Sequence, residues 1–130
     1  MKLRALAFVL PVLMVALSAC GGGGGGTAAG GGGNAAKGKD LFTSKQCITC
    51  HTLAGVTGAV GTIGPPLNGI GSTAASRKSG MTADAYIRES IKTPDAFIVD
   101  GFTKPSLMIL PVAVTDAEIT DLAAFLVSQK

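Results

Sequence analysis

The stretch Cys47-Ile48-Thr49-Cys50-His51 decides how this chain folds. Two cysteines three residues apart, followed at once by a histidine, form a C-x-x-C-H motif. At this spacing two thiols reach the two vinyl groups on one edge of a haem, and the imidazole lies under the iron. The motif therefore predicts one covalent haem c, with Cys47 and Cys50 as thioethers and His51 as an axial iron ligand.

Three other uses of the motif are less favoured. A zinc site needs a fourth ligand, yet His51 is the only histidine and Cys20 the only other cysteine, across a glycine-rich segment. A thioredoxin-like redox pair needs a strand-helix-strand context, which the sequence does not supply. A structural disulfide is compatible with an exported chain, but the short loop and the histidine that follows argue against it.

Length and composition bound the remaining possibilities. The chain has 130 residues, which is enough for one small domain and too short for a large enzyme scaffold. Its net charge is +3. Lys2 and Arg4 belong to the leader, which leaves the rest of the chain close to neutral. Because that part has no long Lys/Arg cluster and few aromatic residues, nucleic acid is not an expected partner.

Residues 1–19 are typical of a secretory signal peptide, with Lys2 and Arg4 ahead of an apolar run. That run is too short for a membrane-spanning helix. Its end, Leu17-Ser18-Ala19-Cys20, resembles the lipobox of bacterial lipoproteins, which implies cleavage before Cys20 and acylation of its thiol. The alternative is an ordinary cleaved leader that releases a soluble protein.

Residues 20–34 combine the lipidated cysteine with a run that is almost all glycine. Such a composition cannot bury apolar surface, so we expect a flexible linker. A phosphate-binding glycine loop is excluded, because no strand precedes it and no Gly-Lys-Ser/Thr follows. The expected location is outside the cytoplasm: exported, anchored to the membrane by lipid, and facing the periplasm or the cell exterior.

Three helices are expected in residues 35–130. Asn34 can cap a helix that runs to about Gln46, and Thr82 opens a second that must end before Pro94. A Thr-x-x-Glu capping box at Thr115 starts the last helix, whose apolar residues recur at helical spacing. No useful alternating strand pattern appears, so the fold class is all-α.

Two segments, 55–80 and 94–111, are expected to be loops, because proline and glycine recur through them. Loops of this length can wrap a flat cofactor. Gly38 weakens the first helix, which a close approach of another helix would explain.

Residues 35–130 resemble a class I cytochrome c in three further motifs. Gly38-Lys39-Asp40-Leu41-Phe42 matches the first helix of that family, and Asp121-Leu122-Ala123-Ala124-Phe125-Leu126 matches its last. Gly64-Pro65-Pro66-Leu67 resembles the loop whose proline carbonyl accepts a hydrogen bond from the axial histidine. The resemblance implies a cytochrome c domain over 35–130 and assigns that carbonyl to Pro65.

The second axial ligand is expected to be a methionine. With one histidine in the chain, the far side of the iron must take Met, Lys, water or nothing. Met81 and Met108 are the methionines that follow the leader. Met108 lies in a proline-bearing stretch before the last helix that resembles the ligand loop of the family, whereas Met81 is expected to pack in the core or begin a helix.

An iron with both axial positions filled passes single electrons, so the expected function is a non-enzymatic electron carrier. Residues 86–101 resemble cytochrome c domains fused to the copper-bearing subunit of some terminal oxidases. The expected partners are therefore a donor complex and an oxidase or other reductase. Lys45, Lys78 and Lys104 are candidate docking residues, or simply solvated surface. The alternative function is a haem sensor or small peroxidase in which Met108 is displaced.

Overall fold

The computed structural model describes residues 32–130, which form four α-helices and one short 3-10 helix. The helices are α1 (Ala35–Ser44), α2 (Ile70–Arg77), α3 (Ala83–Lys92) and α4 (Asp116–Val127), and the 3-10 helix is η1 (Cys47–Thr49). Within 32–130 there is no strand, only an isolated antiparallel bridge between Thr52 and Val60. The expected all-α fold class is confirmed.

The predicted signal peptide at 1–19, the predicted lipidated Cys20 and most of the predicted linker lie outside the described residues. From residue 32 onward, none of the helices combines the length and the apolar character that crossing a bilayer requires.

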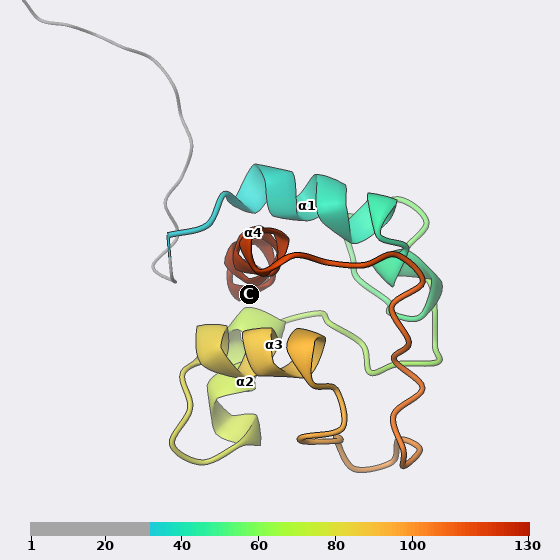
Figure 1. Ribbon diagram of the computed structural model, residues 1–130, viewed down its shortest axis with the longest axis vertical. Coiled ribbons are helices and arrows are strands. Elements are labelled where there is room, and N and C mark those ends of the chain that lie inside the picture. The colour runs from blue at the N-terminus through green and yellow to red at the C-terminus, as the bar shows by residue number, and fades with distance from the viewer. Residues whose placement is uncertain (1–31) are drawn as a thin grey trace, which may run out of the picture.

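Helices α1 and α4 form the packing frame of the domain. Figure 1 shows α1 lying across α4, with α2 and α3 on the opposite side of α4. At the crossing a side chain on Gly38 would collide with the carbonyl of Asp121 and with Phe125. The rings of Phe42 and Phe125 pack beside this point with centroids 5.9 Å apart. The close helix approach that Gly38 predicted is therefore present.

The caps expected from the sequence are also present. Asn34 accepts a hydrogen bond from the Lys37 amide at the start of α1, and Thr82 does the same for Ala85 in α3. Thr115 begins α4 with both bonds of a capping box. Helix α1 ends at Ser44 rather than near Gln46, because Gln46 has a φ of 63° that a right-handed helix cannot include.

The expectation of a continuous loop over 55–80 was wrong, because α2 occupies Ile70–Arg77. Its local signals are weak: the N-cap is Gly69, in the left-handed region, and no side chain caps the helix. Tertiary contacts hold it instead. Ile70 and Ala74 are buried, and Gly71 lies so close to α4 that any side chain there would meet the Val127 carbonyl. The Gly71 amide also donates to the Gln129 carbonyl at 2.8 Å.

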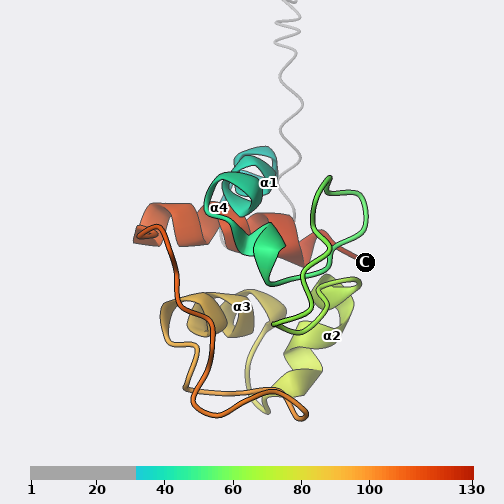
Figure 2. The same ribbon diagram turned by 90° about the vertical axis from the view of Figure 1, so that its right-hand side faces the viewer.

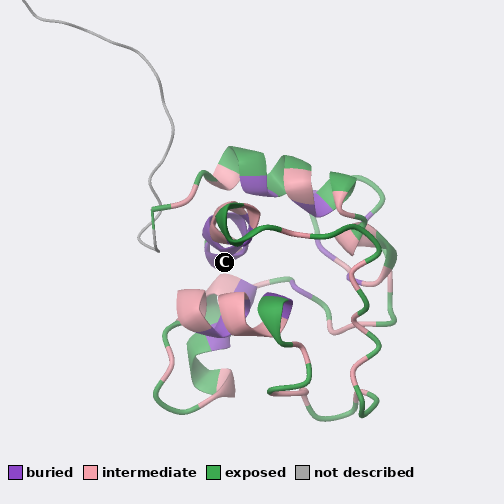
Figure 3. Cartoon of the chain, in the orientation of Figure 1, coloured by how far each residue is buried: buried purple, intermediate pink, exposed green. Residues whose placement is uncertain are grey.

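The other expected loop, 94–111, is irregular as predicted and continues to Thr115. Figure 1 places it on the right-hand side of the molecule, where the segment between η1 and α2 also lies, and Figure 2 looks onto that side. Figure 3 shows that buried residues follow the inner sides of the helices, whereas these two segments are largely exposed or half-buried. The space between the segments and the helices contains the candidate site.

Candidate cofactor site

The C-x-x-C-H motif follows α1 through a tight turn. After Gln46 the chain makes the single 3-10 turn η1, in which the amides of Cys50 and His51 both donate to the Cys47 carbonyl, at 3.2 and 3.0 Å. Cys47 and Cys50 are free thiols, half-buried, and line one pocket together with His51. The local backbone thus turns the three side chains of the motif toward one space.

Burial sets the protonation of Cys47. Loss of solvation raises the pKa of the Cys47 thiol to about 11, so it is a neutral thiol at neutral pH. The reactive cysteine of a redox C-x-x-C pair has a lowered pKa instead. The raised pKa therefore disfavours the thioredoxin-like alternative.

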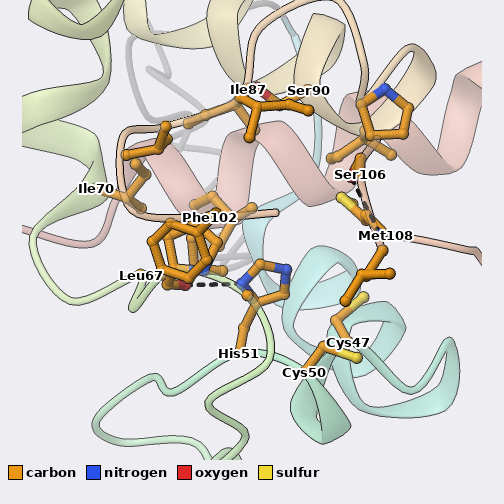
Figure 4. A pocket seen from close by; sticks show the side chains of 18 of the residues that line it. Cys47, Cys50, His51, Leu67, Ile70, Ile87, Ser90, Phe102, Ser106 and Met108 are labelled. Atoms are coloured by element: carbon orange, nitrogen blue, oxygen red, sulfur yellow. Dashed lines mark hydrogen bonds between the residues drawn. The ribbon is translucent and has the colours of Figure 1, made fainter. Parts of the chain in front are cut away.

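His51 is held in one orientation by the loop that resembles the family's proline loop. Its Nδ1 lies 2.8 Å from the Pro65 carbonyl oxygen. Because a carbonyl only accepts hydrogen bonds, Nδ1 carries the proton and Nε2 keeps its lone pair for a metal. Figure 4 shows this bond and the imidazole in the pocket. The predicted contact between His51 and Pro65 is therefore present.

The surroundings of His51 keep its ring neutral. Burial lowers the pKa of the imidazole below its ordinary value of 6.5, against the opposing effect of the Pro65 bond. Gly64 packs against the ring so closely that a Cβ there would overlap it. This contact between Gly64 and the imidazole was not predicted, although Gly64 directly precedes Pro65 in the Gly-Pro-Pro-Leu motif.

Met108 lines the same pocket from a different element, the segment between α3 and α4 (Figure 4). Two polar contacts brace that segment. The Met108 amide donates to the Ser106 hydroxyl at 3.1 Å, and the Ser106 amide donates to the Asp95 carboxylate at 2.6 Å. Met81 is outside this lining, directly before the α3 cap, and packs partly buried against the core as expected.

The pocket suits a large, flat, mainly apolar group with a small anionic part. Its volume is about 1140 Å³ when the open solvent at its mouth is included. Side chains of α2, α3, α4 and both long loops form its walls. Arg77 is the only Asp, Glu, Lys or Arg of the lining. Its guanidinium lies 6.0 Å from the centre of the Tyr86 ring. Arg77 could not be identified from the sequence, because its place in the pocket wall depends on how α2 packs.

These residues fit a haem. Two thiols and a neutral, oriented imidazole lie on one wall, a methionine comes from another segment, and the walls are apolar. The carboxylates of a haem would be matched by the positive charge of Arg77. A zinc site fits poorly, because no group of three or more His, Cys, Asp or Glu gathers anywhere in residues 32–130.

Two of the three candidate docking lysines have partners within the chain. Lys45 pairs with Glu118 at 2.9 Å and donates to the Ala113 carbonyl, and Lys78 pairs with Glu89. Lys104 is exposed. Docking by these lysines stays a prediction.

Comparison with known proteins gives one family. The family model described as Cytochrome c matches residues 35–130. No curated protein matches the chain. The matched range includes every residue that lines the pocket.

Proposed function

The chain belongs to the cytochrome c family, and from that premise we propose that it is a membrane-tethered carrier of single electrons between respiratory redox partners. Its cofactor is covalently bound haem c, and Cys47 and Cys50 fit the attachment motif. Haem-based electron transfer follows from the family. The tether, the partners and delivery to a terminal oxidase are the parts that we propose.

One observation carries the proposal: His51 and Met108 line the same apolar pocket from separate segments. Bound haem supplies one-electron chemistry. The chain contributes the rest. Pro65 orients His51 and leaves its Nε2 lone pair available to a metal, the apolar walls exclude water, and Met108 would offer a soft sulfur that favours reduced iron. Two protein ligands would leave the iron no open position for a substrate.

The first experiment is the visible spectrum of the purified holoprotein, oxidised and reduced, before and after carbon monoxide is added. A closed iron shows the weak far-red band of iron-methionine bonding when oxidised and ignores carbon monoxide when reduced. We expect Met108→Ala to lose the band and to bind carbon monoxide. Met81→Ala is the matched control and is expected to behave like the wild type.

The alternative function, a haem sensor or small peroxidase, predicts a different spectrum. There the wild type itself binds carbon monoxide, because Met108 is absent from the iron or is easily displaced. Peroxide chemistry needs a His or Arg side chain on the open side of the iron; the pocket lining has no histidine besides the axial ligand His51, which leaves Arg77 for that role. Carbon monoxide binding by the wild type would overturn the carrier proposal.

Membrane attachment is proposed through Cys20, with the domain outside the cytoplasm. The support is the lipobox-like Leu17-Ser18-Ala19-Cys20 and its position after an apolar leader. Two or more acyl chains give stable anchoring, because each buried CH₂ contributes about 0.8 kcal/mol. We expect cells fed with labelled palmitate to label the wild type but not Cys20→Ser, and we expect Cys20→Ser to leave the membrane fraction. Equal fractionation of the two proteins would contradict the lipid anchor.

A further inference from the structure

The large apolar side chains that residues 32–130 leave exposed all belong to the two segments beside the pocket. Their exposures run from 38% at Val112 to 81% at Ile109. We call this group the apolar rim; its members are Val60, Ile63, Leu107, Ile109 and Val112. A scattered exposed leucine or valine needs no explanation, but a set gathered on one side of a small domain indicates a contact surface.

The two stretches that contribute the apolar rim, 52–76 and 105–115, carry no formal charge. No Asp, Glu, Lys or Arg occurs between Thr52 and Ser76, and none occurs between Pro105 and Thr115. Of the nearby cations, Lys45 pairs with Glu118 and Lys78 pairs with Glu89, whereas Lys104 is exposed. A surface built in this way offers little electrostatic steering to a charged partner.

The apolar rim is continuous with the cofactor pocket. Ile63 and Leu107 belong to both, with 57% and 56% of their surface exposed while they also line the pocket. Ile63 comes from the segment after His51, and Leu107 precedes Met108. Figures 1 and 2 show these two segments on the same side of the molecule. A protein seated on the rim would therefore lie against the pocket opening.

We propose that the apolar rim is the surface on which a redox partner protein docks, and that this partner presents an apolar, uncharged face. The inference rests on the proposed electron-carrier function, which requires an approach to the pocket. The five side chains expose on the order of a few hundred Å², which suits a transient redox complex and falls far short of the 2,000 Å² or more typical of obligate dimers. A lipid surface on the rim would cover the pocket opening and keep a partner away.

The test follows electron transfer from the reduced, full-length holoprotein to oxygenated respiratory membranes of the producing cell. The second-order rate is measured between about 10 mM and about 300 mM salt, a range that shortens the screening length from roughly 30 Å to roughly 6 Å. We expect the rate to change by less than about twofold. A complex assembled by charge would lose far more over that range.

Two variants separate apolar from charged docking. Ile109 is 81% exposed and outside the pocket lining, so Ile109→Ser removes apolar contact without touching the cofactor. We expect it to lower the second-order rate by roughly tenfold, because a buried isoleucine contributes that much or more to a contact. Lys104→Gln, the matched control, removes an exposed charge close to the rim in sequence and is expected to stay within about twofold of the wild type.

A small oxidant, hexacyanoferrate, distinguishes failure of docking from failure of the carrier function. It needs no apolar contact, so we expect it to oxidise the wild type and both variants at equal rates. If hexacyanoferrate oxidises the wild type but the membranes do not, the docking proposal is overturned and the carrier function stands. If neither oxidises it, the carrier function fails as well.

Other results would assign the rim differently and overturn the proposal. Docking by charge would be shown by a wild-type rate that falls steeply with salt, together with a lower rate in Lys104→Gln and an unchanged rate in Ile109→Ser. A dimer in sedimentation that Ile109→Ser dissociates would assign the rim to a second copy. Release of the protein from membranes by Ile109→Ser would assign it to lipid.

Discussion

Helices α1 and α4 pack directly against each other, whereas the segment between α3 and α4 makes no such helix contact and contributes many of the apolar side chains that line the cofactor pocket. The two helices approach closely at Gly38, and the ring of Phe42 packs at a tilt against that of Phe125. The Asn34 amide donates a hydrogen bond to the Asp121 carboxylate. The segment has few backbone hydrogen bonds of its own, such as that from Phe102 to Val99. The helix pair is stabilised by the chain itself, and the segment depends on what fills the pocket.

The largest effect is expected from removing the covalent attachment. The double variant Cys47→Ala/Cys50→Ala leaves no thiol for a thioether, so we expect complete loss of haem staining after denaturing electrophoresis. Without a filled pocket the apolar side chains of 94–115 lose their contacts. We expect limited proteolysis to cut there first. A first cut inside α1 or α4 would contradict the claim that the helix pair is stable without the cofactor.

Gly38→Ala tests the helix pair. Alanine is the better helix former by about 1 kcal/mol, yet its Cβ would collide with the Asp121 carbonyl. Overpacking typically costs about 1–3 kcal/mol, so after the gain in helix propensity we expect a net loss of up to about 2 kcal/mol in guanidinium unfolding of the holoprotein. Lys39→Ala, at the exposed neighbouring position, is the control and should change stability by less than about 0.5 kcal/mol. A stabilised Gly38→Ala protein would show that the crossing is looser than described.

Arg77→Gln tests whether the charge in the pocket wall acts on the cofactor. A positive charge in the pocket wall disfavours oxidised iron, so its removal should lower the reduction potential by tens of millivolts. Arg77→Lys keeps the charge and should retain most of the potential. Redox titration of the three proteins measures this. Equal potentials in all three would mean that Arg77 does not act on the cofactor.

The smallest effect concerns acid stability at the start of α4. The Thr115 amide and then the Lys45 side chain lower the pKa of Glu118 below its ordinary value of 4.5. The carboxylate is therefore preferred in the folded state, and its contribution is lost as pH falls from about 4.5 through the lowered pKa. We expect melting temperatures of wild type and Glu118→Gln to differ most above about pH 5 and to converge in acid. A constant difference would contradict the assignment.

The helices that begin with a side-chain cap could be predicted from the sequence, whereas the helix held only by distant contacts could not. Caps act within one turn, so Asn34, Thr82 and Thr115 marked the starts of three helices correctly. Helix α2 was missed, because its start at Gly69 carries no side-chain cap and its stability comes from burial of Ile70 and Ala74. Local rules cannot register a contact with a helix that lies far along the chain.

The sequence by itself determined the attachment chemistry, because C-x-x-C-H places three reactive groups within five consecutive residues. It also indicated one domain over 35–130 and a methionine before the last helix. Only the tertiary structure decided that Arg77 enters the pocket wall, that Gly64 packs on the His51 ring, and that Lys45 and Lys78 are paired. It alone gathered the apolar rim beside the pocket. These features join residues far apart in the chain, and their proximity arises from packing, which no local pattern encodes.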